Sequence, residues 1–266
     1  MRVFRRLLAP LNEKTADNFV AHLFPTVGQE LLSLSDVLPS RHESLDDARE
    51  VHRLIIPKVT VRGHSVIGVK VVPPTTDSMK HLKVPSMECA PLFSYGAVEN
   101  GARVTIKVRR VQHVELALGL VLRNRIQSSA DFTRSSISHA VPCIELIGSR
   151  FPFYPPYGQS YVADFLSHVA VVRGSSVTIT NNFPLSTFGG VLGWNGTPIQ
   201  VGFVHQCCHS VEQVLQHCAQ YAAKIGCDLC EGSLILITGM GPKVIAKPGA
   251  YEGMFGPLGS VGCVLD

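Results

Sequence analysis

The most informative segment is Val111-Gln-His-Val-Glu-Leu-Ala-Leu-Gly-Leu-Val-Leu122. Its period-two alternation predicts a β-strand over 111–122. On such a strand His113 and Glu115 point to one face, and the even-numbered apolar residues occupy the other. A histidine and a carboxylate side by side on an apolar strand are costly to bury without a partner. A divalent metal would satisfy both, and a His–Glu hydrogen bond at a solvated sheet edge is the alternative.

A second acidic residue interrupts another apolar segment. Glu145 lies within Pro142–Ile147, which also reads as a strand. If this strand faces the first, His113, Glu115 and Glu145 form a three-ligand facial metal site with positions left open for substrate and water. Carboxylate oxygens suit Mg²⁺ or Mn²⁺, and the His113 imidazole shifts the preference towards Mn²⁺.

A lysine interrupts a third strand. Lys70 lies in Val66-Ile-Gly-Val-Lys-Val-Val72, a segment rich in β-branched residues. One interpretation is an edge lysine whose stem packs while its ammonium group reaches water. The other is a site lysine that pairs with a carboxylate substrate, or acts as acid and base with a lowered pKa.

The order of predicted elements indicates an α+β protein with a mixed or antiparallel sheet. The first 60 residues are predicted to form a helical N-terminal segment, and residues 61–266 a β-rich catalytic domain. Capping boxes begin helices after Ser44 and Ser210, and Asn195-Gly196 predicts a hairpin turn. Regular βαβ alternation is missing, which argues against a doubly wound fold or a (β/α)₈ barrel. The predicted strands are 65–72, 104–108, 111–122, 142–147, 177–180, 191–194, 197–201 and 234–237, and a Gly/Pro-rich tail, 248–262, follows.

Composition narrows the function classes. Of the 266 residues 45% are apolar and 17% charged, with a formal net charge of +4. General disorder is excluded, and neither a nucleic-acid patch nor an apolar membrane run is expected. The eight cysteines are expected as free thiols in the cytoplasm. An arginine-rich start with Arg2, Arg5 and Arg6 makes mitochondrial targeting the alternative.

The chain resembles the 2-keto-4-pentenoate hydratase and 4-oxalocrotonate decarboxylase family, within the fumarylacetoacetate hydrolase superfamily. The resemblance runs from about Ser44 to the C-terminus and lies in an ordered set of motifs. In sequence order these are Ser44-Leu-Asp-Asp-Ala-Arg-Glu-Val-His52, Gly68-Val-Lys70-Val, His113-Val-Glu115-Leu-Ala, Ile144-Glu145-Leu-Ile-Gly-Ser-Arg150, Ala163-Asp164-Phe-Leu-Ser167, Asn195-Gly196 and Phe255-Gly-Pro-Leu-Gly-Ser-Val261.

The resemblance implies a β-rich roll of the fumarylacetoacetate hydrolase type with flanking helices, which forms a homo-oligomer. It implies that Mg²⁺ or Mn²⁺ binds a small 2-oxo acid, and that a hydratase protonates a 2-hydroxy-dienoate and then adds water. The residue roles follow by position. His113, Glu115 and Glu145 become metal ligands, Lys70 and Glu88 acid–base candidates, Ser167 and Thr238 possible substrate contacts, and Asp164 a support for its turn.

Three other functions remain open at this point. One is the decarboxylase branch of the family, acting on 4-oxalocrotonate. Another is carbon–carbon hydrolysis of an acylpyruvate, which needs a His–Glu pair such as His42-Glu43. The last is a binding or scaffold protein whose active site has decayed. This hypothesis is favoured by Val72-Pro-Pro74 and by Phe165 in place of an asparagine. A further departure from the family is His113, which stands where the family has its first glutamate.

Overall fold

Five helices are assigned in the described part of the chain. The structure is a computed structural model that describes residues 13–24, 29–32, 44–73, 84, 86–126, 133–152, 158–180, 183–208 and 210–266. The helices are α1 (Glu13–Leu23), α3 (Leu45–Val61), α5 (Ile106–Arg109), α6 (Gly158–Ala163) and α7 (Val211–Ile225). As predicted, Ser44 and Ser210 cap α3 and α7 by accepting a backbone N–H. Gly226, with φ of 69°, ends α7 in the left-handed region.

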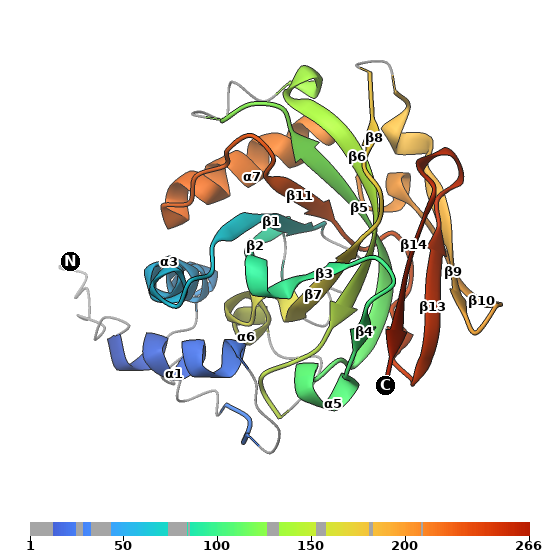
Figure 1. Cartoon of the computed structure of the whole chain (residues 1–266). Coiled ribbons are helices and arrows are strands. Elements are labelled where there is room, and N and C mark those ends of the chain that lie inside the picture. Colours follow the sequence, from blue (N-terminus) through green and yellow to red (C-terminus); the bar gives the residue numbers. More distant parts are fainter. Residues whose placement is uncertain are drawn as a thin grey trace.

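The larger sheet is mixed and strongly curled (Figure 1). Its main path runs β2-β1-β11-β5-β6-β7-β3, with β12 beside β5 and β8 beside β6. The β1–β11 and β3–β7 pairs are parallel and the others antiparallel. The strands are β1 (Val66–Val72), β2 (Glu88–Phe93), β3 (Ala97–Glu99), β5 (His113–Leu122), β6 (Ile137–Ile147), β7 (His168–Arg173), β8 (Val177–Thr178), β11 (Leu234–Ile237) and β12 (Val244–Ile245).

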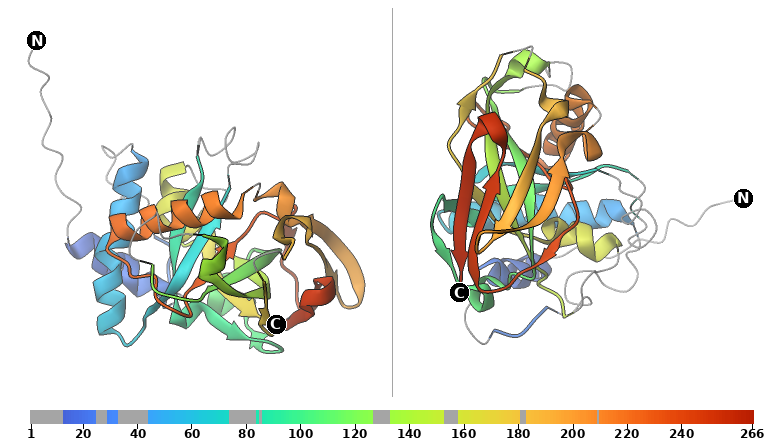
Figure 2. Two further views of the ribbon diagram at one scale, coloured as in Figure 1. Left: turned by 90° about the horizontal axis from the view of Figure 1, so that it is seen from above. Right: turned by 90° about the vertical axis from the view of Figure 1, so that its right-hand side faces the viewer.

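A smaller sheet packs against the first in the order β10-β9-β13-β14-β4. Its strands are β4 (Arg103–Val104), β9 (Gly189–Trp194), β10 (Thr197–Phe203), β13 (Gly249–Met254) and β14 (Ser260–Leu265). The predicted hairpin turn is confirmed, because Asn195 and Gly196 both have positive φ between β9 and β10. The views of Figure 2 place this sheet on the side of the curled sheet away from α1 and α3.

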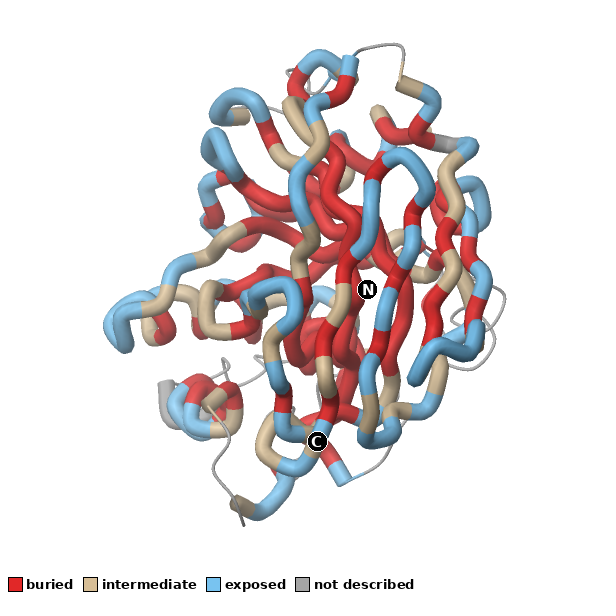
Figure 3. Tube along the Cα trace, turned by 45° about the vertical axis from the view of Figure 1, so that its right-hand side comes forward, coloured by how far each residue is buried: buried red, intermediate tan, exposed pale blue. Residues whose placement is uncertain are grey.

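The two faces of β5 serve different purposes. Its even-numbered apolar residues join the main core between the two sheets and beneath α7. Its odd-numbered face carries His113 and Glu115 and continues into a small apolar floor made by Ala117, Cys143 and Leu236. Buried residues run through these central strands (Figure 3). The predicted α+β class and the roll architecture are confirmed.

Two sequence predictions are wrong. Residues 104–108 do not form a strand, because β4 ends at Val104 and α5 begins at Ile106. The chain crosses here from the smaller sheet to β5, and a helical turn closed by left-handed Arg110 makes that change of direction. The expected tail at 248–262 is instead most of the paired strands β13 and β14. Among the described residues, no helix is long and apolar enough to cross a membrane.

Candidate active site

The register of β5 and β6 brings the two predicted glutamates together. Glu115 lies directly opposite Glu145, and His113 lies opposite Ile147. Opposed residues of an antiparallel pair share a face, so Glu115 and Glu145 are neighbours on the same side of the sheet. Both glutamates are fully buried, whereas His113 is half-buried. The two strands on which the three-ligand hypothesis depends are therefore direct neighbours in the sheet.

Lys70 and His168 converge on one oxygen of Glu145. The Lys70 ammonium and the His168 Nδ1 each lie 2.7 Å from Glu145 Oε1. Lys70 also donates a 2.8 Å hydrogen bond to the carbonyl of Leu166. Lys70 is 1% exposed, so the structure places it inside the protein rather than at a solvated edge. His168, at the start of β7, was not singled out from the sequence.

The two carboxyl groups differ in charge because their partners differ. Burial alone would raise the pKa of Glu145, but Lys70 and His168 outweigh it and bring the pKa down to about 2. Burial raises the pKa of Glu115 to about 7, and the neighbouring charge of Glu145 adds to this effect. Burial lowers the pKa of Lys70, which brings an amine closer to proton transfer near neutral pH.

A strained turn packs against Lys70. Phe165, Leu166 and Ser167 are buried and have φ of 53°, 55° and 60°. These values lie in the left-handed region, which residues other than glycine disfavour. The turn aims the Leu166 carbonyl at Lys70 and leaves the Ser167 hydroxyl oxygen buried with no hydrogen-bond partner. Such strain is typical of functional sites, because it must be stabilised by the surrounding structure.

An ion pair anchors the turn. The backbone N–H and the guanidinium of Arg150 donate to the two oxygens of Asp164, at 3.0 and 2.8 Å. The same guanidinium donates to the carbonyl of His168 at 3.0 Å. Arg150 therefore ties together both ends of the left-handed turn. This geometry agrees with the supporting role that was expected for Asp164.

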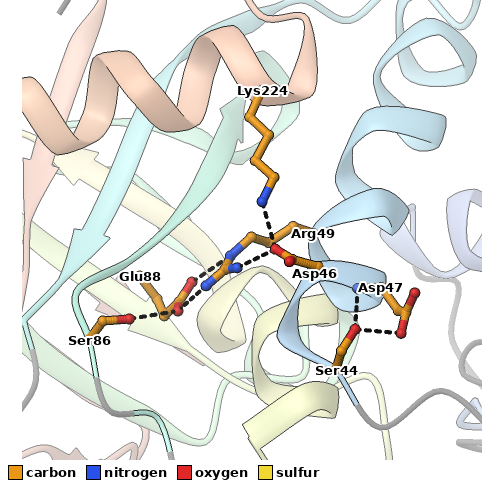
Figure 4. A network of polar contacts seen from close by, with 7 residues as sticks. All are labelled: Ser44, Asp46, Asp47, Arg49, Ser86, Glu88 and Lys224. Carbon is orange, nitrogen blue, oxygen red and sulfur yellow. Dashed lines mark hydrogen bonds and ion pairs between the residues drawn. The ribbon is translucent and has the colours of Figure 1, made fainter. Parts of the chain in front are cut away.

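Glu88 lies on the Lys70 face of the sheet but is bound elsewhere. It is opposite Val72 on β1, two residues beyond Lys70. Arg49 of α3 donates to both Glu88 oxygens, at 3.1 and 2.5 Å (Figure 4). Arg49 also pairs with Asp46, which Lys224 of α7 contacts at 2.6 Å. Glu88 thus belongs to a network that joins β2, α3 and α7.

Thr238 and Gly239 border the cluster after β11. The Thr238 hydroxyl donates to the Val71 carbonyl at 3.2 Å, so it holds β11 to β1. The Gly239 N–H donates to Glu115 Oε1 at 3.3 Å. The turn therefore reaches Glu115 through its backbone. His42-Glu43 and the arginine-rich N-terminus lie outside the described residues.

The donor chemistry suits a hard divalent cation. Glu115 Oε2 and Glu145 Oε2 are buried oxygens without a hydrogen-bond partner, and carboxylate oxygens are preferred ligands of Mg²⁺. Within the described ranges, however, no three His, Cys, Asp or Glu side chains already converge as a metal cluster. The structure assembles two of the three expected ligands face to face, and the complete set with His113 stays a prediction.

Comparisons with known proteins identify the relatives of this chain. It is 28% identical over 260 residues to REH2-associated factor 2 from Trypanosoma brucei brucei, covering 96% of each chain. It is 25% identical over 238 residues to the 2-keto-4-pentenoate hydratase of Paraburkholderia xenovorans, covering 88% of each. No protein-family model matches the chain.

Solved structures share the fold. 4-Oxalocrotonate decarboxylase from Pseudomonas putida G7, complexed with magnesium and adipate, superposes with a TM-score of 0.84 at 20% identity, over 98% of this chain and all of that one. A protein from Oleispira antarctica described as a fumarylacetoacetate isomerase/hydrolase gives 0.51 at 16% identity, over 75% of this chain and 94% of that one. The resemblance drawn from the sequence motifs is confirmed.

Proposed function

We propose that this chain, a relative of 2-keto-4-pentenoate hydratases and 4-oxalocrotonate decarboxylases with the fumarylacetoacetate hydrolase fold, is a divalent-metal-dependent lyase of a small 2-oxo acid. Its first activity is hydration of a 2-hydroxy-dienoate such as 2-hydroxypenta-2,4-dienoate. Relatives named for hydration and for decarboxylation support the reaction class. The choice of this substrate is part of the proposal.

One observation carries the proposal. Two buried carboxyl groups face each other, each with one unpaired oxygen, and a buried lysine contacts one of them. A purely structural ion pair would be expected to satisfy all of its buried oxygens, because unpaired buried polar atoms are costly. The free oxygens of Glu115 and Glu145 are therefore best explained by a ligand that binds there.

Each residue of the cluster has a role in this reaction. Glu115, Glu145 and His113 hold Mg²⁺ or Mn²⁺, and His113 favours Mn²⁺. A bound cation would polarise the oxygens of the 2-oxo acid and stabilise developing negative charge. Lys70 moves the proton, because its buried ammonium group loses a proton more readily than an exposed one.

The remaining candidates act around this centre. Glu88 is a second acid–base group, and its carboxylate is oriented by Arg49. The Ser167 hydroxyl, whose oxygen is unpaired in the structure, contacts the substrate. Thr238, which directly precedes the Gly239 N–H that donates to Glu115, is the other expected substrate contact.

The test is the ultraviolet decay of 2-hydroxypenta-2,4-dienoate with purified protein, with and without Mg²⁺ or Mn²⁺. We expect metal-dependent decay to 4-hydroxy-2-oxopentanoate that is lost in Glu145→Gln. The control is Glu99→Gln, a matched change of an exposed glutamate on β3. Decay that is equal with EDTA, or retained in Glu145→Gln, would contradict the proposed site.

Products of other reactions would assign the chain to a different activity. Loss of CO₂ from 4-oxalocrotonate would establish the decarboxylase branch, and pyruvate released from an acylpyruvate would establish the hydrolase. All three reactions use the same electron-withdrawing 2-oxo acid group. The product therefore separates them, whereas the metal dependence does not.

A second candidate is a binding protein with a decayed site. The relative that matches over 96% of both chains is named as an associated factor of REH2, which supports an association role for this chain as well. Its test is co-elution of the purified chain with the protein that corresponds to REH2 in the same organism. Co-elution together with metal binding and no turnover of any of the acids would favour this candidate over the lyase.

The proposal extends to assembly and location. We expect a homo-oligomer in the cytoplasm, with mitochondria as the alternative because of the N-terminal arginines. Sedimentation of the full chain tests the first expectation. Imaging of a chain tagged at its C-terminus tests the second.

A further inference from the structure

A second lysine lies on the same face as the carboxylates. Strand β12 pairs with β5 so that Val244 is opposite Val114 and Ile245 is opposite His113. Lys243 directly precedes β12, so the register carries it to the position opposite Glu115. Opposed residues of an antiparallel pair share a face, and Lys243 therefore lies on the side of the sheet that bears Glu115.

Lys243 reaches from the sheet towards α6. Its Nζ lies 5.7 Å from the centroid of the Tyr161 ring, and Tyr161 is buried on the short helix that leads into the strained turn. Lys243 itself is exposed, unlike Lys70. Burial and then the Lys243 charge lower the pKa of His113. The Lys243 backbone thus lies beside Glu115, and its exposed side chain is near enough for its charge to act on His113.

The charges of the site call for an anion with two charges. Glu115 and Glu145 carry two negative charges when both are ionised, and Lys70 and Lys243 carry two positive charges. A divalent cation then leaves an excess of two positive charges, one in the buried cluster, where uncompensated charge is costly, and one on the exposed Lys243. A monocarboxylate neutralises the first, whereas a dicarboxylate neutralises both.

We propose that Lys243 is a specificity-determining residue that binds the distal carboxylate of a 2-oxo dicarboxylate. This inference rests on the proposed function, because the 2-oxo acid end of the ligand lies at Lys70, Glu115 and Glu145. It narrows the substrate class of that site, since an acid with a second carboxylate would bind better than 2-hydroxypenta-2,4-dienoate, which has one. The flexible four-carbon stem of a lysine lets its ammonium group follow the distal carboxylate. Lys70 and Lys243 then contact opposite ends of one ligand.

The test is calorimetric binding of 2-oxoadipate and 2-oxohexanoate in the presence of Mg²⁺. The two acids have the same chain length and differ in a distal carboxylate or methyl group. The wild-type protein is expected to prefer 2-oxoadipate by about tenfold, since the difference is one charge-assisted contact at a partly solvated group. Lys243→Met is expected to bind both acids equally, with the affinity for 2-oxohexanoate unchanged.

Lys247→Met is the matched control. Lys247 is also exposed and its Nζ lies 5.7 Å from the Trp194 ring centroid, so this variant removes the same kind of lysine–aromatic contact on the smaller sheet. It is expected to keep the full preference for 2-oxoadipate.

Three results would overturn the inference. A preference retained in Lys243→Met, or equal binding of the two acids by the wild type, removes the role of Lys243 and leaves the proposed lyase standing. A wild type that binds neither Mg²⁺ nor either acid removes the proposed function, and the inference with it.

Discussion

Replacing Lys70 by methionine removes the ammonium group beside Glu145 while keeping most of the volume of the side chain. Both partners of this 2.7 Å ion pair are buried, at 1% and 0% exposure. In this variant the Glu145 carboxylate loses Lys70 and keeps His168 as its partner. Breaking one side of a buried ion pair costs about 3–5 kcal/mol, and we expect a loss of unfolding free energy in that range.

Lys224→Met is the control for this loss. Lys224 forms an equally short ion pair, 2.6 Å from Asp46, but both side chains are more than half exposed. Exposed pairs contribute only about 0.5 kcal/mol because water screens them. The two variants therefore make the same chemical change in ion pairs of nearly equal length, 2.7 and 2.6 Å, that differ in burial.

The assay is urea denaturation followed by the fluorescence of Trp194, the single tryptophan, near neutral pH with EDTA. Equal losses in Lys70→Met and Lys224→Met would refute the claim that the cluster is a desolvated charge network. Repeating the measurement in Mg²⁺ adds a second criterion. The cation supplies the missing positive charge at Glu145, so it is expected to stabilise Lys70→Met more than the wild type.

Ser167→Gly should raise the unfolding free energy by about 1 kcal/mol, because relief of the left-handed strain exceeds the entropic cost of glycine; a loss of stability in urea would contradict this account. Without metal, the stability that Glu115 contributes should be present below its ordinary pKa and vanish as the pH rises through about 7, because its folded pKa is raised. The pKa of buried His52 is lowered by burial to about 4, so its contribution to stability rises with pH where that of Glu115 falls. The readout is therefore the difference in melting temperature between wild type and Glu115→Gln as a function of pH. His113→Ala and Glu145→Ala should each weaken Mn²⁺ binding by at least tenfold in calorimetry, as expected for loss of a ligand, and unchanged affinity in both would exclude the three-ligand site.

Local patterns in the sequence predicted much of the fold. The alternation around His113 and Glu115 predicted β5, because a strand with one buried polar face has a period of two. Ser44 and Ser210 predicted their helix starts, since a hydroxyl at that position satisfies an open N–H. These features depend on a few neighbouring residues. They can therefore be predicted without knowledge of the tertiary contacts.

The contacts of Lys70 could not be predicted in the same way. Lys70 contacts Glu145 and the carbonyl of Leu166, both of which lie far from Lys70 in the sequence. The sheet brings Glu145 to Lys70, and the left-handed turn brings the Leu166 carbonyl. The sequence Asp164-Phe-Leu-Ser167 contains no glycine to signal positive φ. The resemblance pointed to the position of Ser167, but not to the strain or to His168. Glu88 was identified as an acid of interest, whereas its pairing with Arg49 required the packing of α3 on β2.

The position of β11 has a consequence for how the protein is made. β11 lies between β1 and β5, although the ribosome produces it long after both. Until Ile237 has emerged, β1 and β5 keep open edges, and Lys70 is not yet held across the sheet from Glu145. Open edges of this kind promote aggregation, and pairing across long separations is slow. Nascent chains and fragments that end before β11 are therefore expected to need chaperones, even though they already contain Lys70, Glu115 and Glu145.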